Sequence, residues 1–176
     1  MKKIAFAFST VVLCLLLSCS DTKTASNTNE KANKNLDNTK AVINMFVTGD
    51  FSKVGDYIAA DGVDHSSPKG EIKSLDSLKA MFAYYSSTMS DVKNEVIQGL
   101  ANDDYSMVWL KQSSTAKVDD PSMGMKAGQH SEMQTVEVCK HGADGKITDH
   151  WSFVSMTDMM KMMPQMPMMD TTHKAK

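Results

Sequence analysis

The chain is 176 residues long, which is enough for one folded domain with additional segments. Its 19 basic residues are all lysine, and against 21 acidic residues they leave a formal net charge of −2. Nucleic-acid binding and bidentate phosphate recognition rely on basic, arginine-bearing surfaces. We therefore expect no nucleic-acid partner.

The N-terminus has the pattern of an export signal. Two lysines precede an apolar run over residues 4–17, which is too short to span a bilayer comfortably. The run leads into the sequence LLSC at residues 16–19, which resembles the cleavage site of a bacterial lipoprotein. This resemblance implies that residues 1–18 are a signal peptide and that a lipid on Cys19 holds the protein in the membrane.

The residues after Cys19 extend this interpretation. Ser20 and Asp21 favour the outer membrane of a Gram-negative bacterium as the location. Residues 19–35 contain no large apolar side chain, so they bury too little surface to offset the entropy lost on ordering. We expect a flexible tether here, followed by a domain that begins at residue 36. With Cys19 lipidated, Cys139 has no disulfide partner and is predicted to be a buried apolar side chain.

The first part of the domain has the periodicity of helices. Apolar residues at helical spacing predict a helix from Leu36 to Val47, which Gly49-Asp50 ends. A second, short helix is expected over residues 51–60, followed by a brief extended piece at residues 62–65. Ser74 is the expected N-cap of a third helix that runs to about residue 85.

From residue 91 the apolar pattern changes to a period of two. Strands are predicted over residues 91–100, 104–117, 129–141 and 146–155, with hairpin turns at residues 102–104 and 143–145. Helices followed by a run of antiparallel strands predict an α+β fold. One domain should cover residues 36–156, and residues 157–176 should form a methionine-rich helix or tail.

Three segments resemble the SnoaL-like branch of the NTF2-like superfamily. They are GDFSKVGDYIAADGVDHSS (residues 49–67), SDVKNEVIQGLANDDYSMVW (90–109) and DGKITDHW (144–151). The resemblance implies a cone in which N-terminal helices pack on a strongly bent antiparallel sheet. It also implies a largely apolar pocket, open at one end, with a few polar groups inside.

Strand alternation and the resemblance together predict the pocket lining. Alternation puts His150 and Ser152 on one face of the last strand, and Glu137 on one face of the preceding strand. In ketosteroid isomerase relatives these faces line the pocket, and the family's D-x-V-D-H segment adds a histidine that points into the cavity. The predicted pocket residues are Asp64, His65, Thr135, Glu137, Cys139, Thr148, His150 and Ser152.

A histidine beside a carboxylate can act as a general acid–base pair, because histidine titrates near neutral pH. The predicted catalytic residues are His65, Glu137 and His150, with His65 or Glu137 as the base of a cyclase, isomerase or hydrolase. The tyrosine that ketosteroid isomerases pair with the acid at the Glu137 position corresponds to Val42, and the aspartate base of the SnoaL-type cyclases corresponds to Ser152. These departures count against both reactions in the form the relatives use.

The leading hypothesis is therefore that the pocket binds a small, mainly apolar molecule without a cofactor. Fold alone does not decide between binding and catalysis. A further alternative is a homodimer in which Trp151 and Phe153, on the opposite face of the last strand, lie in the interface.

Methionine is the second unusual feature, because eight of the sixteen methionines lie between residues 156 and 169. Thioethers are soft ligands that suit Cu(I), so the tail predicts, as an alternative, a copper-binding envelope protein. The competing interpretation is that the methionines pack a C-terminal helix that Pro164 and Pro167 end. The Cu(I) ligands would be Met159, Met160, Met162, Met163, Met166, Met168 and Met169.

Overall fold

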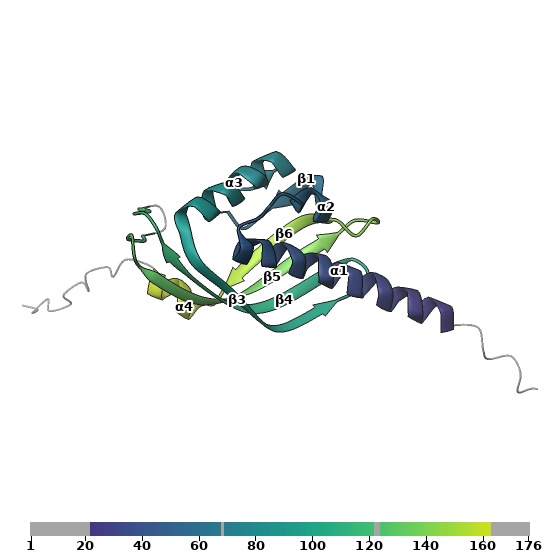
Figure 1. The fold of residues 1–176 in the computed structure, drawn as a ribbon. Helices are drawn as coiled ribbons and strands as arrows, with labels where there is room; N and C mark the ends of the chain where they lie inside the picture. The colour runs from purple at the N-terminus through teal and green to yellow at the C-terminus, as the bar shows by residue number, and fades with distance from the viewer. Residues whose placement is uncertain (1–21, 68, 122–123, 163–176) are drawn as a thin grey trace, which may run out of the picture.

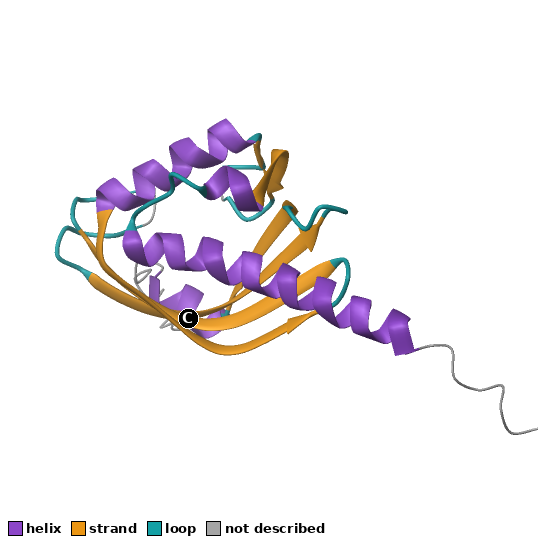
Figure 2. Ribbon diagram, turned by 45° about the vertical axis from the view of Figure 1, so that its right-hand side comes forward, coloured by secondary structure: helices purple, strands orange, loops and turns teal. Residues whose placement is uncertain are grey.

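The computed structural model describes residues 22–67, 69–121 and 124–162, in which helices pack against one curved sheet (Figure 1). Helix α1 (Thr22–Thr48) packs on two strands at one edge of the sheet, and α3 (Leu75–Thr88) packs near the other edge. The single-turn helix α2 (Val54–Tyr57) joins α1 to the sheet, and α4 (Met156–Met162) follows the last strand. Figure 2 shows the sheet curving around α1.

The sheet has six strands in the order β2-β1-β6-β5-β4-β3. They are β1 (Ile58–Asp64), β2 (Ile72–Lys73), β3 (Met89–Ala101), β4 (Tyr105–Ala116), β5 (His130–His141) and β6 (Ile147–Val154). All neighbours are antiparallel except β1 and β6, which are parallel. The α+β fold and the NTF2-like cone are thus confirmed.

The chain leaves the second helix earlier than its sequence predicts. Helix α2 spans only Val54–Tyr57, and β1 begins at Ile58 inside the predicted helix of residues 51–60. Ile58 pairs with Ile147 of β6, and both side chains are buried. The strand partner lies far along the chain, so local periodicity gives no sign of it.

Helix α1 also begins earlier, at Thr22, so the expected domain boundary at residue 36 lies inside a helix. Asn35 is fully buried, and its Nδ2 donates to the carbonyl oxygens of Asn102 and Asp103 in the β3–β4 turn. Lys34 and Asn38 donate to Asp144 and Gly145 in the β5–β6 turn, each at 2.9 Å. Polar side chains thus hold this part of α1 against two hairpin turns. Residues of α1 that were expected in the tether, because they lack large apolar side chains, therefore belong to the ordered domain.

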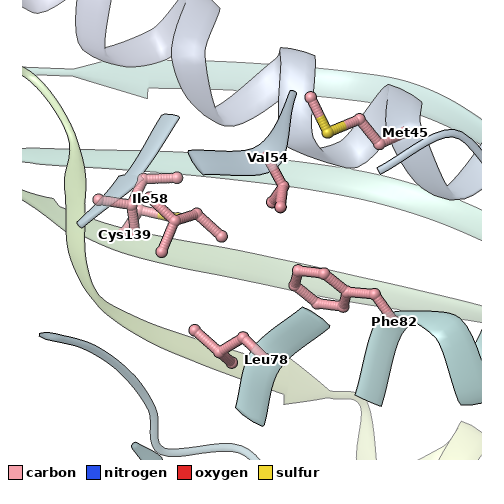
Figure 3. Packing of buried hydrophobic residues seen from close by; sticks show 7 residues of the cluster. Met45, Val54, Ile58, Leu78, Phe82 and Cys139 are labelled. Carbon is pink, nitrogen blue, oxygen red and sulfur yellow. The ribbon is translucent and has the colours of Figure 1, made fainter. Parts of the chain in front are cut away.

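The buried apolar core lies between the helices and the inner face of the sheet (Figure 3). Phe46 of α1 contacts Phe51, Phe82 and Tyr85 edge-on, with ring centroids 5.0 to 5.3 Å apart. Such edge-to-face contacts add to the stabilisation from burial. Cys139 is 3% exposed, which confirms that it is a buried side chain. The core residues are Met45, Val54, Ile58, Leu78, Phe82, Cys139 and Ile147.

Among the described residues, none of the helices combines the length and apolar character needed to cross a bilayer. The predicted signal peptide and Cys19 lie outside these residues, as do Met163, Met166, Met168 and Met169.

Candidate acid–base site

A cavity of about 490 Å³ lies between the helices and the sheet. Its wall is mainly apolar, with Val42 and Phe46 from α1 and Leu78 and Phe82 from α3. Polar side chains on the wall include Asp64 of β1, Gln112 of β4, Glu137 of β5 and His150 of β6. A mainly apolar cavity of this size with a few convergent polar groups is the usual form of a small-molecule site.

Two Asp-His dipeptides meet where β1 and β6 run side by side. Asp64 and His65 lie at the end of β1, and Asp149 and His150 lie in β6. The parallel register sets Asp64 directly opposite His150. Because successive strand residues point to opposite faces, one Asp–His pair forms on the inner face and the other on the outer face.

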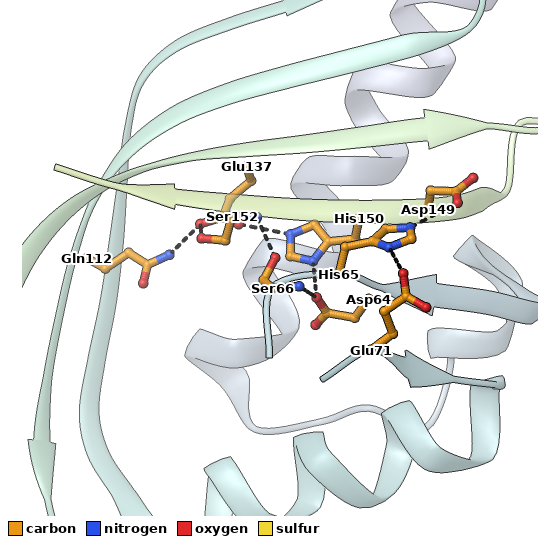
Figure 4. Close-up of polar contacts among 9 residues, drawn as sticks. All are labelled: Asp64, His65, Ser66, Glu71, Gln112, Glu137, Asp149, His150 and Ser152. Carbon is orange, nitrogen blue, oxygen red and sulfur yellow. Dashed lines mark hydrogen bonds and ion pairs between the residues drawn. The ribbon is translucent and has the colours of Figure 1, made fainter. Parts of the chain in front are cut away.

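The inner pair is part of a chain of three side chains, which we call the acid–base site: Asp64, His150 and Glu137 (Figure 4). His150 Nδ1 lies 3.3 Å from Asp64 Oδ1, and His150 Nε2 lies 2.9 Å from Glu137 Oε2. Both carboxylate side chains are 9% exposed, whereas the His150 ring is 30% exposed. All three residues line the cavity.

Further donors hold the two carboxylates. Glu137 Oε1 accepts from Ser152 Oγ at 3.1 Å and from Gln112 Nε2 at 3.3 Å. Asp64 Oδ1 accepts from the backbone N–H of Ser66 at 2.7 Å. Buried carboxylates need such partners, since an unpaired buried charge costs several kcal/mol.

The charge state of the site follows from these contacts. Burial alone would lower the pKa of His150, but the hydrogen bonds and negative charges of Asp64 and Glu137 raise this pKa to about 9. Burial would raise the pKa of Asp64, but His150 and Ser66 hold it below its usual value. At neutral pH the site is therefore an imidazolium between carboxylates.

The outer pair consists of His65 and Asp149. His65 was predicted to point into the pocket, but it does not line the cavity. His65 Nδ1 lies 2.8 Å from Glu71 Oε1, and Nε2 lies 3.1 Å from Asp149 Oδ1. The ring stacks on Trp151 with centroids 4.7 Å apart and planes 10° apart. The hydrogen bond to Asp149, together with Glu71, raises the pKa of His65. Alternation explains the position, because Asp64 takes the inward direction and its neighbour must point outward.

The other predicted pocket residues divide in the same way. Cys139 and Ser152 line the cavity with the acid–base site, whereas Thr135 and Thr148 do not. Thr135 is buried and accepts a hydrogen bond from Gln112 Nε2 at 3.2 Å. Burial raises the pKa of the Cys139 thiol to about 12, so this side chain is an inert part of the wall.

Thr148 lies at an irregularity in the β5–β6 register. Lys140 pairs with Asp149 and His141 pairs with Ile147, so Thr148 has no partner across the ladder. The extra residue reverses the alternation, and Ile147 rather than Thr148 lies on the cavity wall. The predicted alternation is correct at His150 and Ser152 and wrong at Thr148, because it assumes a regular strand.

Sequence reasoning missed several residues of the cavity wall, chiefly Gln112, Asn94 and Ser66. Gln112 follows Val108 and Leu110 at strand spacing on β4, and both of these are fully buried. That spacing was the available signal, since it places Gln112 on the inner face. Asn94 and Ser66 have no comparable signal.

No cluster of three His, Cys, Asp or Glu side chains with the arrangement of a metal site occurs among residues 22–67, 69–121 and 124–162. Of the proposed Cu(I) ligands, Met159 and Met160 lie on α4 and are 43% and 64% exposed. Met162 ends that helix. Copper binding by the methionine-rich tail stays a prediction.

Solved structures with the same fold include an epoxide hydrolase, a polyketide cyclase and an enzyme that resembles both. An LEH-like epoxide hydrolase from M. tuberculosis is 12% identical with a TM-score of 0.61, covering 74% of this chain and 90% of that chain. A SnoaL-like polyketide cyclase from Agrobacterium tumefaciens is 15% identical with a TM-score of 0.58, covering 71% and 94%. SalBIII, an epoxide hydrolase/cyclase-like enzyme in pyran ring formation in the polyether salinomycin, is 16% identical with a TM-score of 0.59, covering 72% and 94%.

A search of curated protein sequences found no match. At these identities the structural likeness establishes the fold alone. The sequence itself matches the family of SnoaL-like polyketide cyclases over residues 37–166, which is most of the chain. The chain therefore belongs to the SnoaL-like polyketide cyclase family.

Proposed function

We propose that the cavity binds a small, mainly apolar molecule and that the acid–base site transfers a proton on it, with Asp64 as the base. The observation that carries this proposal is the chain of Asp64, His150 and Glu137 on the wall of an apolar cavity. Buried ion pairs contribute little net stability, whereas titratable groups with shifted pKa values in a cavity are typical of functional sites.

The hydrogen bonds distinguish the roles of the three residues. Both ring nitrogens of His150 face carboxylates, and the ring is protonated at neutral pH, so it has no lone pair to accept a proton. Glu137 is held by three donors, from His150, Ser152 and Gln112. The His150 ring and the backbone N–H of Ser66 both lie at Oδ1 of Asp64, so Oδ2 has neither of these two partners (Figure 4). We therefore assign Asp64 as the base and His150 as the residue that positions it.

Membership of the family supports a reaction of the cyclase or hydrolase type. The solved structures that resemble this protein include an epoxide hydrolase and an epoxide hydrolase/cyclase-like enzyme. Reactions in which an oxygen nucleophile opens or closes a ring need a base to take the nucleophile's proton. His65, the other base expected from the sequence, does not line the cavity.

The test uses 5-nitrobenzisoxazole, a small aromatic molecule that reports on a base in an apolar cavity. Removal of its ring C–H proton breaks the N–O bond and releases a coloured nitrile phenolate. We expect the protein to accelerate this reaction on the order of 10²-fold over acetate at equal concentration. Asp64→Asn should abolish the acceleration. Asp149→Asn, which alters a carboxylate on the outer face, should keep it.

A rate equal to that of acetate would reject the proposed base. Equal rates for Asp64→Asn and the unchanged protein would move the base elsewhere. Binding of 5-nitrobenzisoxazole without turnover would leave a binding protein as the function.

We also propose that the protein is anchored to the envelope through a lipid on Cys19, in the outer membrane of a Gram-negative bacterium. The support is the signal pattern of residues 1–18 and the LLSC sequence that ends at Cys19. Mass spectrometry of the N-terminal peptide should show acyl chains on Cys19, and Cys19→Ser should leave the signal peptide uncleaved. An unmodified Cys19 in the mature protein would reject the anchor.

A further inference from the structure

We infer that the ligand presents a hydrogen-bond donor, a hydroxyl or an amine, to the acid–base site and carries no negative charge. This inference rests on the proposed function, because it names the class of molecule that the cavity would bind. Three features of the cavity wall lead to it: the donors, the acceptors and the charges.

The donors around the acid–base site are already engaged, and the Ser66 hydroxyl is engaged with the Asp64 carboxyl. His150 directs both ring nitrogens at carboxylates, at 3.3 Å and 2.9 Å. Ser152 Oγ donates to Glu137, and Gln112 Nε2 donates to Glu137 and to Thr135. A ligand carbonyl or oxyanion would have to displace one of these hydrogen bonds, and the displaced carboxylate would then lose a partner.

The acceptors, in contrast, have capacity left. Asp64 meets His150 and the backbone N–H of Ser66 through Oδ1, and Gln112 donates through Nε2. These contacts leave Asp64 Oδ2 and Gln112 Oε1 with capacity to accept, and both residues line the cavity. Figure 4 shows the Gln112 nitrogen directed at Glu137 and its oxygen turned away. The reverse orientation of the amide would set its oxygen against the Glu137 carboxylate, so chemistry fixes this assignment. A hydroxyl or amine of the ligand can donate to these oxygens without disturbing the existing network.

The charges on the wall point in the same direction. The acid–base site sets two carboxylates, Asp64 and Glu137, against the single positive charge of His150. A ligand anion beside the acid–base site would face an excess of carboxylates in a cavity that screens charge less than water does. The wall should therefore reject an anion and accept a neutral or cationic group.

The test compares four molecules that share one apolar body and differ only in the polar group. They are 2-naphthalenemethanol, 2-naphthylmethylamine, 2-naphthaldehyde and 2-naphthoate, titrated into the full-length protein by calorimetry. We expect the alcohol and the amine to bind at least tenfold more tightly than the aldehyde and the carboxylate. Asp64→Asn should reduce this preference to less than threefold, whereas the control Asp149→Asn should preserve it.

Equal affinities for all four molecules, or tighter binding of the aldehyde or the carboxylate, would overturn the inference and leave the binding function standing. Failure of all four to bind would overturn the binding function together with the inference. If the unchanged protein fails to turn over 5-nitrobenzisoxazole but still binds the alcohol and the amine more tightly, only the proposed base is rejected.

Discussion

The two faces of the sheet carry the same arrangement in different surroundings. Inside, His150 lies between Asp64 and Glu137, and outside, His65 lies between Glu71 and Asp149. The two inner carboxylate side chains are 9% exposed, whereas Glu71 is 47% and Asp149 is 25% exposed. The outer histidine also covers an aromatic ring, Trp151, while the inner one borders a cavity.

The comparison shows that surroundings, rather than residue type, decide what an Asp–His pair contributes. Exposed ion pairs are screened by solvent and contribute about 0 to 1 kcal/mol. In a buried group, removal of one member leaves an uncompensated charge. The outer group of His65, Glu71 and Asp149 is therefore suited to linking the segment that carries Glu71 to β6. The acid–base site is suited to proton transfer.

The largest expected difference lies in stability. His150→Ala leaves Asp64 and Glu137 buried without the positive charge between them, so we expect a loss of about 3–5 kcal/mol in the free energy of unfolding. His65→Ala should cost no more than about 1 kcal/mol, because its partners reach solvent. Urea unfolding of both variants at pH 7 measures the difference. Losses of similar size would show that the two clusters are equivalent.

The pH dependence of unfolding sharpens the comparison with a smaller effect. The pKa of His150 rises from 6.5 to about 9 on folding, so its stabilisation is complete below pH 6.5 and is lost as the pH rises through 9. The loss should be on the order of 3 kcal/mol between pH 6 and pH 10. The pKa of His65 is raised too, so this residue adds a contribution of the same sign.

The variants separate the two contributions. Most of the alkaline loss should remain in His65→Ala and disappear in His150→Ala, as measured by urea unfolding at the two pH values. An alkaline loss that disappears in His65→Ala instead would assign the titration to the outer cluster.

Most of the fold could be predicted from the sequence, because strand alternation and hairpin turns are local patterns. The four long strands begin and end within about two residues of their predicted positions. Ser74 caps α3 as expected and accepts a hydrogen bond from the backbone N–H of Ser77. The start of β1 and the beginning of α1 depend on partners far along the chain, and local patterns do not contain those partners.

The candidate site was predictable in part for the same reason. Alternation on β5 and β6 gives Glu137, His150 and Ser152, and the resemblance adds Asp64. The position of His65 requires the register between β1 and β6, and the position of Thr148 requires the irregularity between β5 and β6. The choice of Asp64 as the base depends on which carboxylate oxygens His150 and the other donors reach, and only atomic positions supply that.

The parallel pairing of β1 with β6 also has a consequence for how the chain finds its native topology. These strands lie far apart in sequence, with 84 residues separating His65 from Asp149, so their contact closes a long loop and should form late in folding. A slip of one residue would set Asp64 against Asp149 and His65 against His150, matching like charges across the ladder. The repeated Asp-His dipeptide therefore favours the native register, since the two strands attract each other in that alignment and repel each other after this slip; a slip in the other direction sets Asp64 opposite Trp151 and loses the attraction.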